Sequence, residues 1–359
     1  MTSDSQRQQA LMTMNQIKTI DRSRSLRKQV LMAALLASVV AVFLLNIALG
    51  SVRIPLNDVV GVLTGKAGIS NTFQSIIMKI RLPRALATVA GGACLALSGL
   101  LLQIFFSNPI VEPYVLGVSS GATMFVSIVV LGGFTFGLGS ISPMFMFLGS
   151  LVGALVVTLA VVFAAQKVKS IITLLVIGMM AGYLCSAVRG ILSTFASLES
   201  LGSLTMWTMG SFSGFTWQMV RILSVITTIF SFAAVLMSKP LNAMLLGEEY
   251  AQSMGLGIRA FRMAVIIIAS VLTAVLTAFA GPVSFVGLAV PHLMRMGFKT
   301  SDNRTLLPAC ILGGALMTGA CDLIARTILS PHELAIGAIT SIVGAPLVIY
   351  MLLKGDTGL

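Results

Sequence analysis

Charged and aromatic residues are scarce in this 359-residue chain, at 9% and 7% of its positions. Hydrophobic residues make up 57% of it and the mean hydropathy is +1.01. These values exclude a soluble domain, because too few polar side chains remain to cover its surface. Cysteine is rare as well. Cys94, Cys185, Cys310 and Cys321 lie inside apolar runs without CxxC spacing, which indicates packing residues and neither disulfides nor metal ligands.

Groups that could perform chemistry are also few. The only histidines, His292 and His332, lie 40 positions apart, and neither belongs to the HExxH motif of a zinc protease. The segment Gly61 to Lys66 resembles a phosphate-binding loop, but three residues separate its glycines where four are required. An intramembrane enzyme would need a paired nucleophile and base or a metal cluster, so the sequence disfavours this class.

Long apolar runs are what the sequence does contain. Runs of about 20 residues match the roughly 30 Å hydrocarbon core of a bilayer, which predicts an all-α polytopic membrane protein with about ten transmembrane helices. The first run lacks a convincing cleavage site and is interpreted as an uncleaved span. A surface helix is expected around Leu56 to Leu63. The expected spans are 29–50, 83–105, 116–137, 141–165, 171–192, 215–237, 262–280, 283–297, 306–328 and 334–353.

The chain is therefore divided into a basic tail at 1–28, a ten-helix transmembrane domain at 29–353 and a short tail at 354–359. Within the domain, Gly149 and Gly153, and likewise Gly178 and Gly182, have the four-residue spacing that is typical of closely packed membrane helices.

The formal net charge of +12 fits membrane topology better than nucleic-acid binding, because the basic residues occupy short segments between apolar runs. One predicted face carries Arg22, Arg24, Arg27, Lys28, Lys167, Lys169, Lys239, Arg259, Arg262, Arg295, Lys299, Arg304 and Lys354. The positive-inside rule makes this face cytoplasmic and places both termini on it. The opposite face still holds Arg53, Lys66, Lys79, Arg81 and Arg84, an excess that suggests a function for some of them.

The segment from Ser238 to Arg262 is the most hydrophilic interruption in the second half of the chain, and it is too long for a simple turn. Pro240 stops the preceding span, and Gly247 separates a first short helix from a second that runs from Glu248 to about Met254. Glu248 and Glu249 lie in the first turn of the second helix, where the positive end of the helix dipole stabilises carboxylates. We expect a compact knob with a small apolar face that binds a protein partner. The alternative is a connecting loop that happens to be helical.

Ionisable groups inside the expected spans are sparse. Asp322 and Arg326 lie one turn apart and could neutralise each other, and Arg189 can extend to the membrane interface. An ion-coupled secondary transporter would need intramembrane carboxylates or unwound helices, and no series of buried carboxylates suggests a proton relay. If the protein moves a solute uphill, the energy is expected to enter from another chain.

Several stretches together carry a resemblance to a known family. They are RLPRALATVAGGACLALSGLLLQIFFSNPIVEPYVLGVSSGA at 81–122, LGEEYAQSMGLGIRAFR at 246–262, GPVSFVGLAVPHLMR at 281–295, DNRTLLPACILGGALMTGACDLIAR at 302–326 and ELAIGAITSIVGAPLVIYMLL at 333–353. The chain resembles the permease subunit of a bacterial type II ABC importer of the iron-siderophore, haem and cobalamin uptake family. The resemblance covers nearly the whole chain after the tail.

The resemblance implies a type II permease fold that works as a homodimer, or as a pseudo-dimer with a homologue, in the cytoplasmic (inner) membrane. Two cytoplasmic ABC ATPase subunits and one periplasmic or lipid-anchored substrate-binding protein complete the assembly. ATP and Mg bind to the partner subunits, and this chain itself is expected to hydrolyse nothing. The family's frequent substrates make a ferric siderophore the first expectation, ahead of haem and cobalamin.

Site residues carried over from the family fall into two docking groups. The segment 238–262 matches the coupling helices that contact the ATPase, with Gly247, Glu248, Glu249, Ala251 and Gly255. Arg81, Arg84 and Arg326 match arginines that face the binding protein in cobalamin permeases, where bidentate pairing with carboxylates suits arginine. The alternatives are interfacial snorkelling for Arg81 and Arg84, and the Asp322 pair for Arg326.

The resemblance also implies a gate at the cytoplasmic end of a pathway along the dimer axis. The gate would consist of Asn108, Pro109 and Ile110 together with Ser170, Ile171 and Ile172. Family members can carry hydroxyl residues where this chain has Ile171 and Ile172, and an apolar constriction can still close by steric block and dewetting. Tyr114 stands where the family motif usually continues with Gly. The fifth and tenth spans would line the pathway, with Met179, Met180, Tyr183 and Ser186 as candidates; the alternative for the methionines is core filling.

Overall fold

The computed structural model describes residues 2–50, 52, 54–66, 70–135, 143–168, 170–330 and 332–354, and within these ranges every regular element is a helix. Arg53, Lys169 and the C-terminal residues 355–359 lie outside the described residues. The elements are α1 Thr2–Ala48, α2 Leu56–Leu63, α3 Asn71–Ile76, the π-helical turn η1 Ile77–Arg81, α4 Leu82–Phe105, the 3₁₀ turn η2 Pro113–Leu116, α5 Val118–Thr135, α6 Pro143–Lys167, α7 Ile171–Thr194, α8 Leu198–Thr208, α9 Trp217–Leu236, α10 Ser238–Met244, α11 Glu248–Ser253, α12 Ile258–Ala280, α13 Val286–Phe298, α14 Asn303–Thr327 and α15 Ile336–Lys354.

Ten of these helices correspond to the ten expected spans. Seven helical segments in the described ranges are long and apolar enough to cross a membrane: those of α1, α3 to α4, α6, α7, α9, α12 and α14. Helices α5 and α15 contain shorter apolar segments, and α13 is a short helix of 13 residues that follows a break in the chain. The prediction of an all-α polytopic membrane protein is confirmed.

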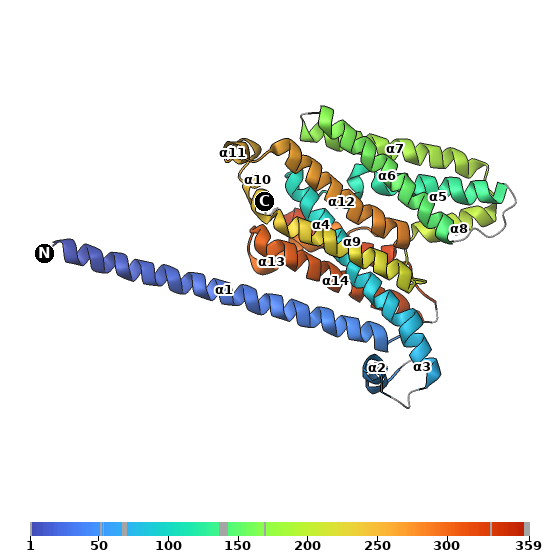
Figure 1. Cartoon of the computed structure of the whole chain (residues 1–359), viewed down its shortest axis with the longest axis horizontal. Helices are drawn as coiled ribbons and strands as arrows, with labels where there is room; N and C mark the ends of the chain where they lie inside the picture. The colour runs from blue at the N-terminus through green and yellow to red at the C-terminus, as the bar shows by residue number, and fades with distance from the viewer. Residues whose placement is uncertain are drawn as a thin grey trace.

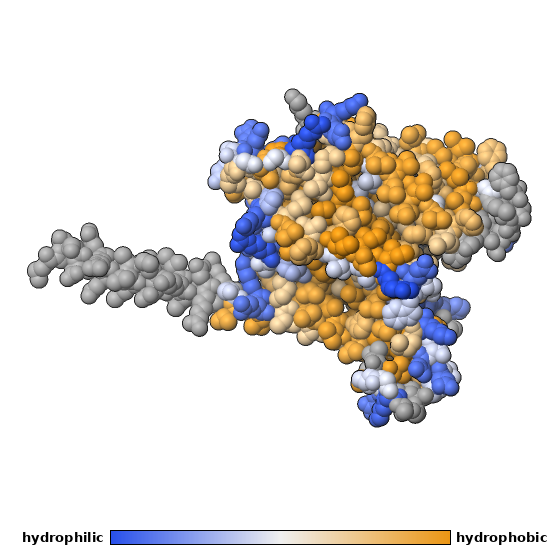
Figure 2. Space-filling view, in the orientation of Figure 1, coloured by the Kyte–Doolittle hydropathy of each residue, from blue (hydrophilic) through white to orange (hydrophobic). Residues whose placement is uncertain are grey.

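The helices form one bundle with polar elements at its two ends. Helices α10 and α11 lie at the same end as the first turns of α1, and α2, α3 and α8 lie toward the other (Figure 1). On the face in view, a broad hydrophobic surface lies between these ends, and hydrophilic residues gather near them (Figure 2). This distribution is what a bilayer requires, because only an apolar surface can face its hydrocarbon core.

Helix α4 is the centre of the bundle and packs against α9, α12, α13 and α14. Nearly all of its side chains are buried. Glycine permits the closest approaches: a Cβ atom added at Gly92 would lie 2.1 Å from the carbonyl oxygen of Gly314, and one added at Gly99 would lie 1.8 Å from that of Gly287. Small residues therefore bring the backbones of α4, α13 and α14 into contact.

The predicted four-residue glycine pairs serve the same purpose. A Cβ atom at Gly153 would lie 2.2 Å from the oxygen of Gly121, and one at Gly178 would lie 3.0 Å from the Cα atom of Leu116. All four cysteines are buried and free, as expected. The predicted surface helix is confirmed as α2, whereas α3, η1 and α8 were not anticipated from the sequence.

Candidate functional site

The polar segment 238–262 folds into the two short helices that the sequence predicts, α10 and α11. Gly247 and Gly255, which bound α11, have φ angles of 104° and 88°. A side chain would strain the backbone at both positions, so glycine defines the length of the knob. We use the name knob for residues 238–254.

Two side-chain interactions attach the knob to the bundle. Glu248 accepts hydrogen bonds from Arg262 of α12, and the closest N–O distance is 2.8 Å. Asn242 of α10 donates to Asp302 at 2.6 Å and accepts from the backbone N–H of Asn303 at 2.8 Å, both at the start of α14. The knob is therefore joined by side-chain hydrogen bonds to α12 and to the start of α14.

The five coupling residues predicted from the resemblance do not all face outward. Ala251 is fully buried against the bundle, and Glu248 is partly buried by its contact with Arg262, so these two hold the knob together. Glu249 is exposed. Three large apolar residues within five positions of Glu249, which the resemblance did not single out, are each more than half exposed: Leu246, Tyr250 and Met254. These four residues form what we call the knob face.

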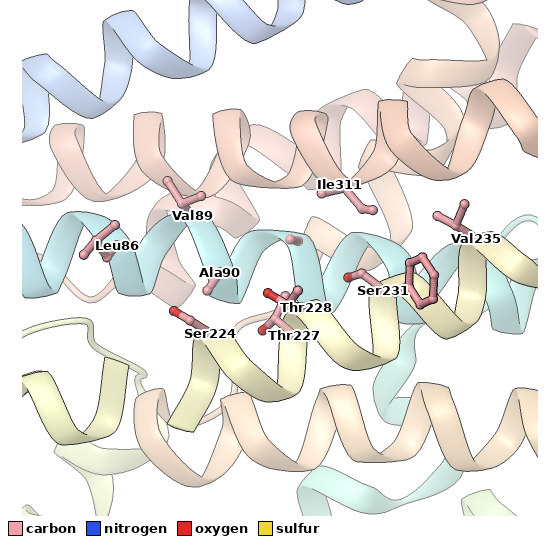
Figure 3. Close-up of a pocket in the computed structure, with 11 residues that line it drawn as sticks. Leu86, Val89, Ala90, Ser224, Thr227, Thr228, Ser231, Val235 and Ile311 are labelled. Atoms are coloured by element: carbon pink, nitrogen blue, oxygen red, sulfur yellow. The ribbon is translucent and has the colours of Figure 1, made fainter. Parts of the chain in front are cut away.

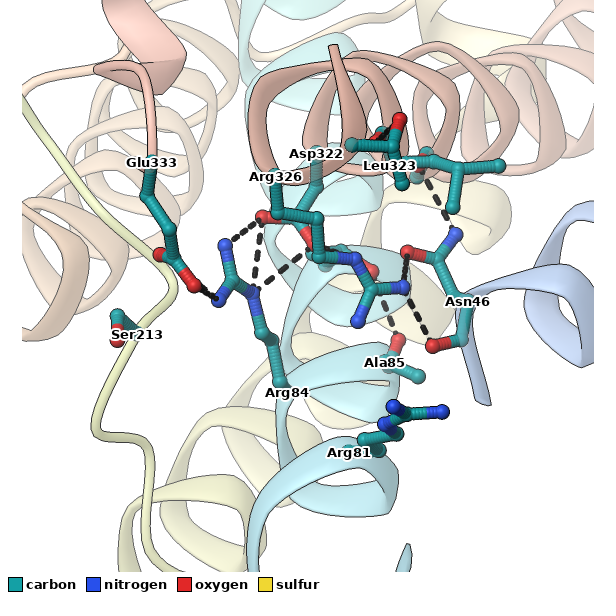
Figure 4. A network of polar contacts seen from close by, with 12 residues as sticks. Asn46, Arg81, Arg84, Ala85, Ser213, Asp322, Leu323, Arg326 and Glu333 are labelled. Atoms are coloured by element: carbon teal, nitrogen blue, oxygen red, sulfur yellow. Dashed lines mark hydrogen bonds and ion pairs between the residues drawn. The ribbon is translucent and has the colours of Figure 1, made fainter. Parts of the chain in front are cut away.

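At the other end of the bundle the structure brings Arg81, Arg84 and Arg326 together (Figure 4). All three are buried, with at most 7% of the residue exposed. Arg84 lies at the centre: its Nε and Nη2 atoms donate to both oxygens of Asp322 at 2.9–3.1 Å, and its Nη1 atom donates to Glu333 at 2.8 and 3.0 Å. Asp322 is 1% exposed, whereas the Glu333 side chain is 45% exposed.

The other two arginines bind the C-terminal end of α1. Arg81 donates to the carbonyl oxygens of Ile47 at 2.8 Å and Ala48 at 2.7 Å, and also to that of Val52. Arg326 donates to the carbonyl oxygen of Asn46 and, at 2.7 Å, to its side-chain oxygen. The last carbonyl groups of a helix lack intrahelical partners and carry the negative end of its dipole, so cations stabilise them. This local role accounts for Arg81, one of the five basic residues that the sequence places on the face where the positive-inside rule expects few.

These contacts distinguish the alternatives for the three arginines, which are interfacial snorkelling for Arg81 and Arg84 and an ion pair with Asp322 for Arg326. Snorkelling does not describe Arg81 and Arg84, because their guanidinium groups are buried in hydrogen bonds within the chain. The Asp322–Arg326 pair does form, at 3.8 Å, but Asp322 makes its shorter contacts with Arg84. A recess of about 260 Å³ reaches this cluster, lined by Gly50, Val52, Ile76, Ile80, the three arginines and Glu333. Its size admits a carboxylate of another protein.

The candidate gate consists of two turns at the ends of their helices. After α4, the side chain of Asn108 accepts a hydrogen bond from the N–H of Ile110 at 3.0 Å, which closes a compact turn. Ser170 accepts from the N–H of Thr173 at 3.3 Å and thereby caps α7. Ile110 and Ile172 are 49% and 74% exposed, so each turn exposes one apolar residue, and the gate itself stays a prediction.

The candidate pathway residues lie on an exposed face of α7. Met179, Met180 and Tyr183 are 40%, 51% and 63% exposed, and Ser186 is exposed as well. Neither methionine is therefore buried in the core of this chain. Helix α15 also has an exposed apolar face, which includes Ile342 and Val343. Both faces are available for a second copy of the chain or for a solute.

Between α12 and α13 the chain is not helical from Gly281 to Phe285, a feature that a bilayer tolerates only where other groups satisfy the backbone. The hydroxyl of Tyr114 accepts from the N–H of Val283 at 2.9 Å, and Glu112 accepts from the N–H of Phe285. Tyr114, the departure from the family motif, thus has a defined structural role. No local pattern in the sequence predicts this pairing, because the residues involved are about 170 positions apart.

Comparison with known proteins identifies the family. The profile described as the FecCD transport family matches residues 36–354. The chain belongs to the FecCD transport family. It is 37% identical over 281 residues to the vitamin B12 import system permease of Klebsiella pneumoniae subsp. pneumoniae, covering 78% of this chain and 83% of that protein. The same protein of Salmonella typhi is 37% identical over the same length, covering 84% of it.

Solved structures agree with this assignment. An inward-facing conformation of a transporter described as the metal-chelate ABC type is 30% identical, with a TM-score of 0.80, and the match covers 90% of this chain and 99% of that one. PsaBC from Streptococcus pneumoniae, solved with a Fab, matches with a TM-score of 0.50 at 13% identity, which supports the fold alone. This FecCD chain is thus the membrane permease of an ABC importer.

Proposed function

We propose that this permease carries a metal chelate into the cytoplasm, driven by ATP and Mg bound to two ABC ATPase subunits that dock on the knob face. The observation that carries the proposal is the knob itself. It exposes Leu246, Tyr250 and Met254 together with Glu249, and aromatic and methionine side chains are enriched in protein interfaces. It is also tied to α12 and α14 by Glu248 and Asn242. Movement of the ATPase subunits would thus displace whole helices as rigid bodies.

The second proposed contact is with a substrate-binding protein at the arginine recess. An acidic residue of that protein would enter the recess and pair with Arg84 on the side now occupied by Glu333. Glu333 is the exposed member of the cluster and holds Arg84 through Nη1 alone, so it can be displaced while Asp322 keeps Arg84 in place. Arginine favours this exchange because its planar group binds two carboxylates at once.

The proposed topology places the knob and both termini in the cytoplasm of a cell whose inner membrane holds the permease. The basic residues near the knob, among them Lys239, Arg259 and Arg304, support this orientation. Two copies would meet through the exposed apolar faces of α7 and α15, so that Met179, Met180 and Tyr183 line the space between them. Flexible thioethers there would contact a bulky chelate without binding it tightly.

For the substrate, a corrinoid of the cobalamin type is our first candidate, because the permeases from Klebsiella and Salmonella, at 37% identity, are named for vitamin B12 import. The ferric siderophore expected from the sequence becomes the second, and haem the third. Purification of the co-expressed complex, followed by metal analysis and an absorption spectrum of the binding protein, distinguishes them. Cobalt indicates a corrinoid, iron without a Soret band a siderophore, and a Soret band haem.

The ATPase contact is tested by Glu249→Lys in the complex reconstituted with its ATPase. Glu249→Lys should reduce ATPase activity stimulated by the loaded binding protein, because it reverses the charge of an exposed residue of the knob face. Glu199→Lys is the matched control, since Glu199 is an exposed carboxylate on α8 at the opposite end of the bundle. Equal activity of the two variants would contradict docking on the knob face.

A further inference from the structure

A groove runs along the bundle between α4 and α9, with α14 at its edge (Figure 3). Its volume is about 460 Å³. Apolar residues such as Ala90 and Ala93 of α4 form its floor, and Ser224, Thr228 and Val235 mark its length on α9. The segment from Ser224 to Val235 is about 16 Å long at a rise of 1.5 Å per residue. The groove therefore extends along about half of a hydrocarbon core that is roughly 30 Å thick.

The surroundings of the groove are those of a surface that faces lipid. Val225 and Ile229 of α9 flank it and are 56% and 58% exposed, and Phe232, which lines it, is 64% exposed. The groove is not part of the knob face, the arginine recess or the exposed face of α7, so neither a docking partner nor the solute accounts for it. An extended hydrocarbon chain fits its length and its apolar floor.

Two cations lie beyond one end of the groove. Lys239 follows Val235 by four residues, and Arg304 precedes Ile311, the groove residue of α14, by seven. Lys239 lies in the first turn of α10, a separate helix that begins after α9 ends at Leu236, and Arg304 lies in the first turn of α14. The hydrogen bond from Asn242 of α10 to Asp302, the N-cap residue of α14, joins these two helix starts at the end of the groove nearest the knob. Both side chains are exposed. The carboxylate Asp302 lies close to Arg304 in the sequence and accepts a hydrogen bond from Asn242. Two cations thus accompany one carboxylate at this end of the groove, and the three groups together remain positively charged.

We propose that the groove binds an anionic phospholipid of the cytoplasmic leaflet, with one acyl chain along α9 and the phosphate between Lys239 and Arg304. Basic sites between transmembrane helices on the cytoplasmic side attract anionic headgroups. The choice of the cytoplasmic leaflet rests on the orientation proposed for the permease. The groove and the positions of its two cations do not depend on that orientation.

The position of this lipid links it to energy coupling. Lys239 belongs to α10 of the knob, and Arg304 belongs to the first turn of α14, the two elements that Asn242 and Asp302 already connect. A phosphate bound by both cations would add a second connection between α10 and the first turn of α14. Anionic lipid would therefore stiffen the element that receives the motion of the ATPase.

The test uses the purified permease in vesicles of phosphatidylcholine and phosphatidylglycerol in equal parts, with a trace of either lipid carrying a photoreactive diazirine in its acyl chain. Cross-linked peptides are identified by mass spectrometry. We expect cross-links concentrated on α4 and α9 along the groove, with a roughly 30-fold preference for phosphatidylglycerol. This figure follows from about 1 kcal/mol for each of two cations near the membrane surface, with a factor of ten for every 1.4 kcal/mol.

Two pairs of variants separate the parts of the proposal. Thr228→Trp fills the groove and should reduce its cross-links at least several-fold, whereas Val225→Trp, on the lipid-facing side of the same helix, should leave them unchanged. Lys239→Gln with Arg304→Gln should abolish the preference for phosphatidylglycerol but retain the groove cross-links. Lys167→Gln with Arg259→Gln removes the same charge from exposed residues elsewhere at that end and should retain both.

Cross-links spread evenly over the exposed faces of α6, α7 and α9 would overturn the proposal. So would an equal effect of Thr228→Trp and Val225→Trp, or equal labelling by the two lipids. The measurement needs neither ATPase nor binding protein, so its outcome is independent of the transport function proposed above.

Discussion

Asparagine at position 322 would keep the shape of the Asp322 side chain and remove its charge. Asp322 is 1% exposed and accepts hydrogen bonds from Nε and Nη2 of Arg84, with Arg326 at 3.8 Å. Without the carboxylate, two buried guanidinium groups lose their shared counter-charge. Removal of one partner from a buried ion pair costs about 3–5 kcal/mol. Because Arg84 retains Glu333, we expect a loss near the lower value.

The matched control is Glu333→Gln, in which the same guanidinium group loses its other carboxylate. The Glu333 side chain is 45% exposed, and exposed ion pairs contribute about 0–1 kcal/mol. Denaturant unfolding of the purified protein in detergent micelles measures both losses through tryptophan fluorescence. Trp217 is well placed as the reporter, because its indole N–H donates to the carbonyl oxygen of Met78, close to Arg81.

The expected order is a much larger loss for Asp322→Asn than for Glu333→Gln. A double variant, Arg84→Met with Asp322→Leu, should recover part of the stability, because apolar residues of similar volume can replace a buried pair. Equal losses in the two single variants, or a loss below about 1 kcal/mol for Asp322→Asn, would refute the view that Asp322 fixes the arginines in place.

Three further predictions concern other contacts. Gly314→Ala should destabilise the fold by about 1–3 kcal/mol or more through overpacking, since its Cβ atom would lie 2.1 Å from the oxygen of Gly92; Gly190→Ala, with open space around it, should not lower the unfolding midpoint. Tyr114→Phe should cost about 1–3 kcal/mol because the N–H of Val283 loses its partner, while Tyr183→Phe on the exposed face of α7 should be neutral in the same assay. Glu333→Gln should strengthen capture of the binding protein in a pull-down, by removing the carboxylate that competes for Arg84, and weaker capture would contradict that competition.

The knob could be predicted from the sequence because its determinants are local. Gly247 and Gly255 end helices through their own backbone conformation, and a hydrophilic segment of this length cannot enter the bilayer. The spans could be predicted for the same reason, because a transmembrane helix is recognised from the length and the apolar composition of its own segment. The sequence indicated the break before α13 only through the shortness of the span expected at 283–297.

The contacts between distant elements were not predictable. Arg84 lies 238 positions from Asp322, and the sequence suggested Arg326 as the partner of this carboxylate because only the spacing along one helix was visible. Resemblance identified the three arginines, but it did not indicate that Arg81 and Arg326 bind the end of α1. Burial of Ala251 and exposure of Tyr250 depend likewise on how the knob rests against α12, which no local pattern determines.

The most direct test of the account is transport itself. Proteoliposomes that contain the permease and its ATPase, with chelate-loaded binding protein on the face that carries the arginine recess and ATP with Mg on the face that carries the knob, are assayed for metal in the compartment on the knob face. The account predicts accumulation that requires ATP hydrolysis, persists in Glu199→Lys and is lost in Glu249→Lys. Accumulation without ATP, or equal accumulation in both variants, would contradict it.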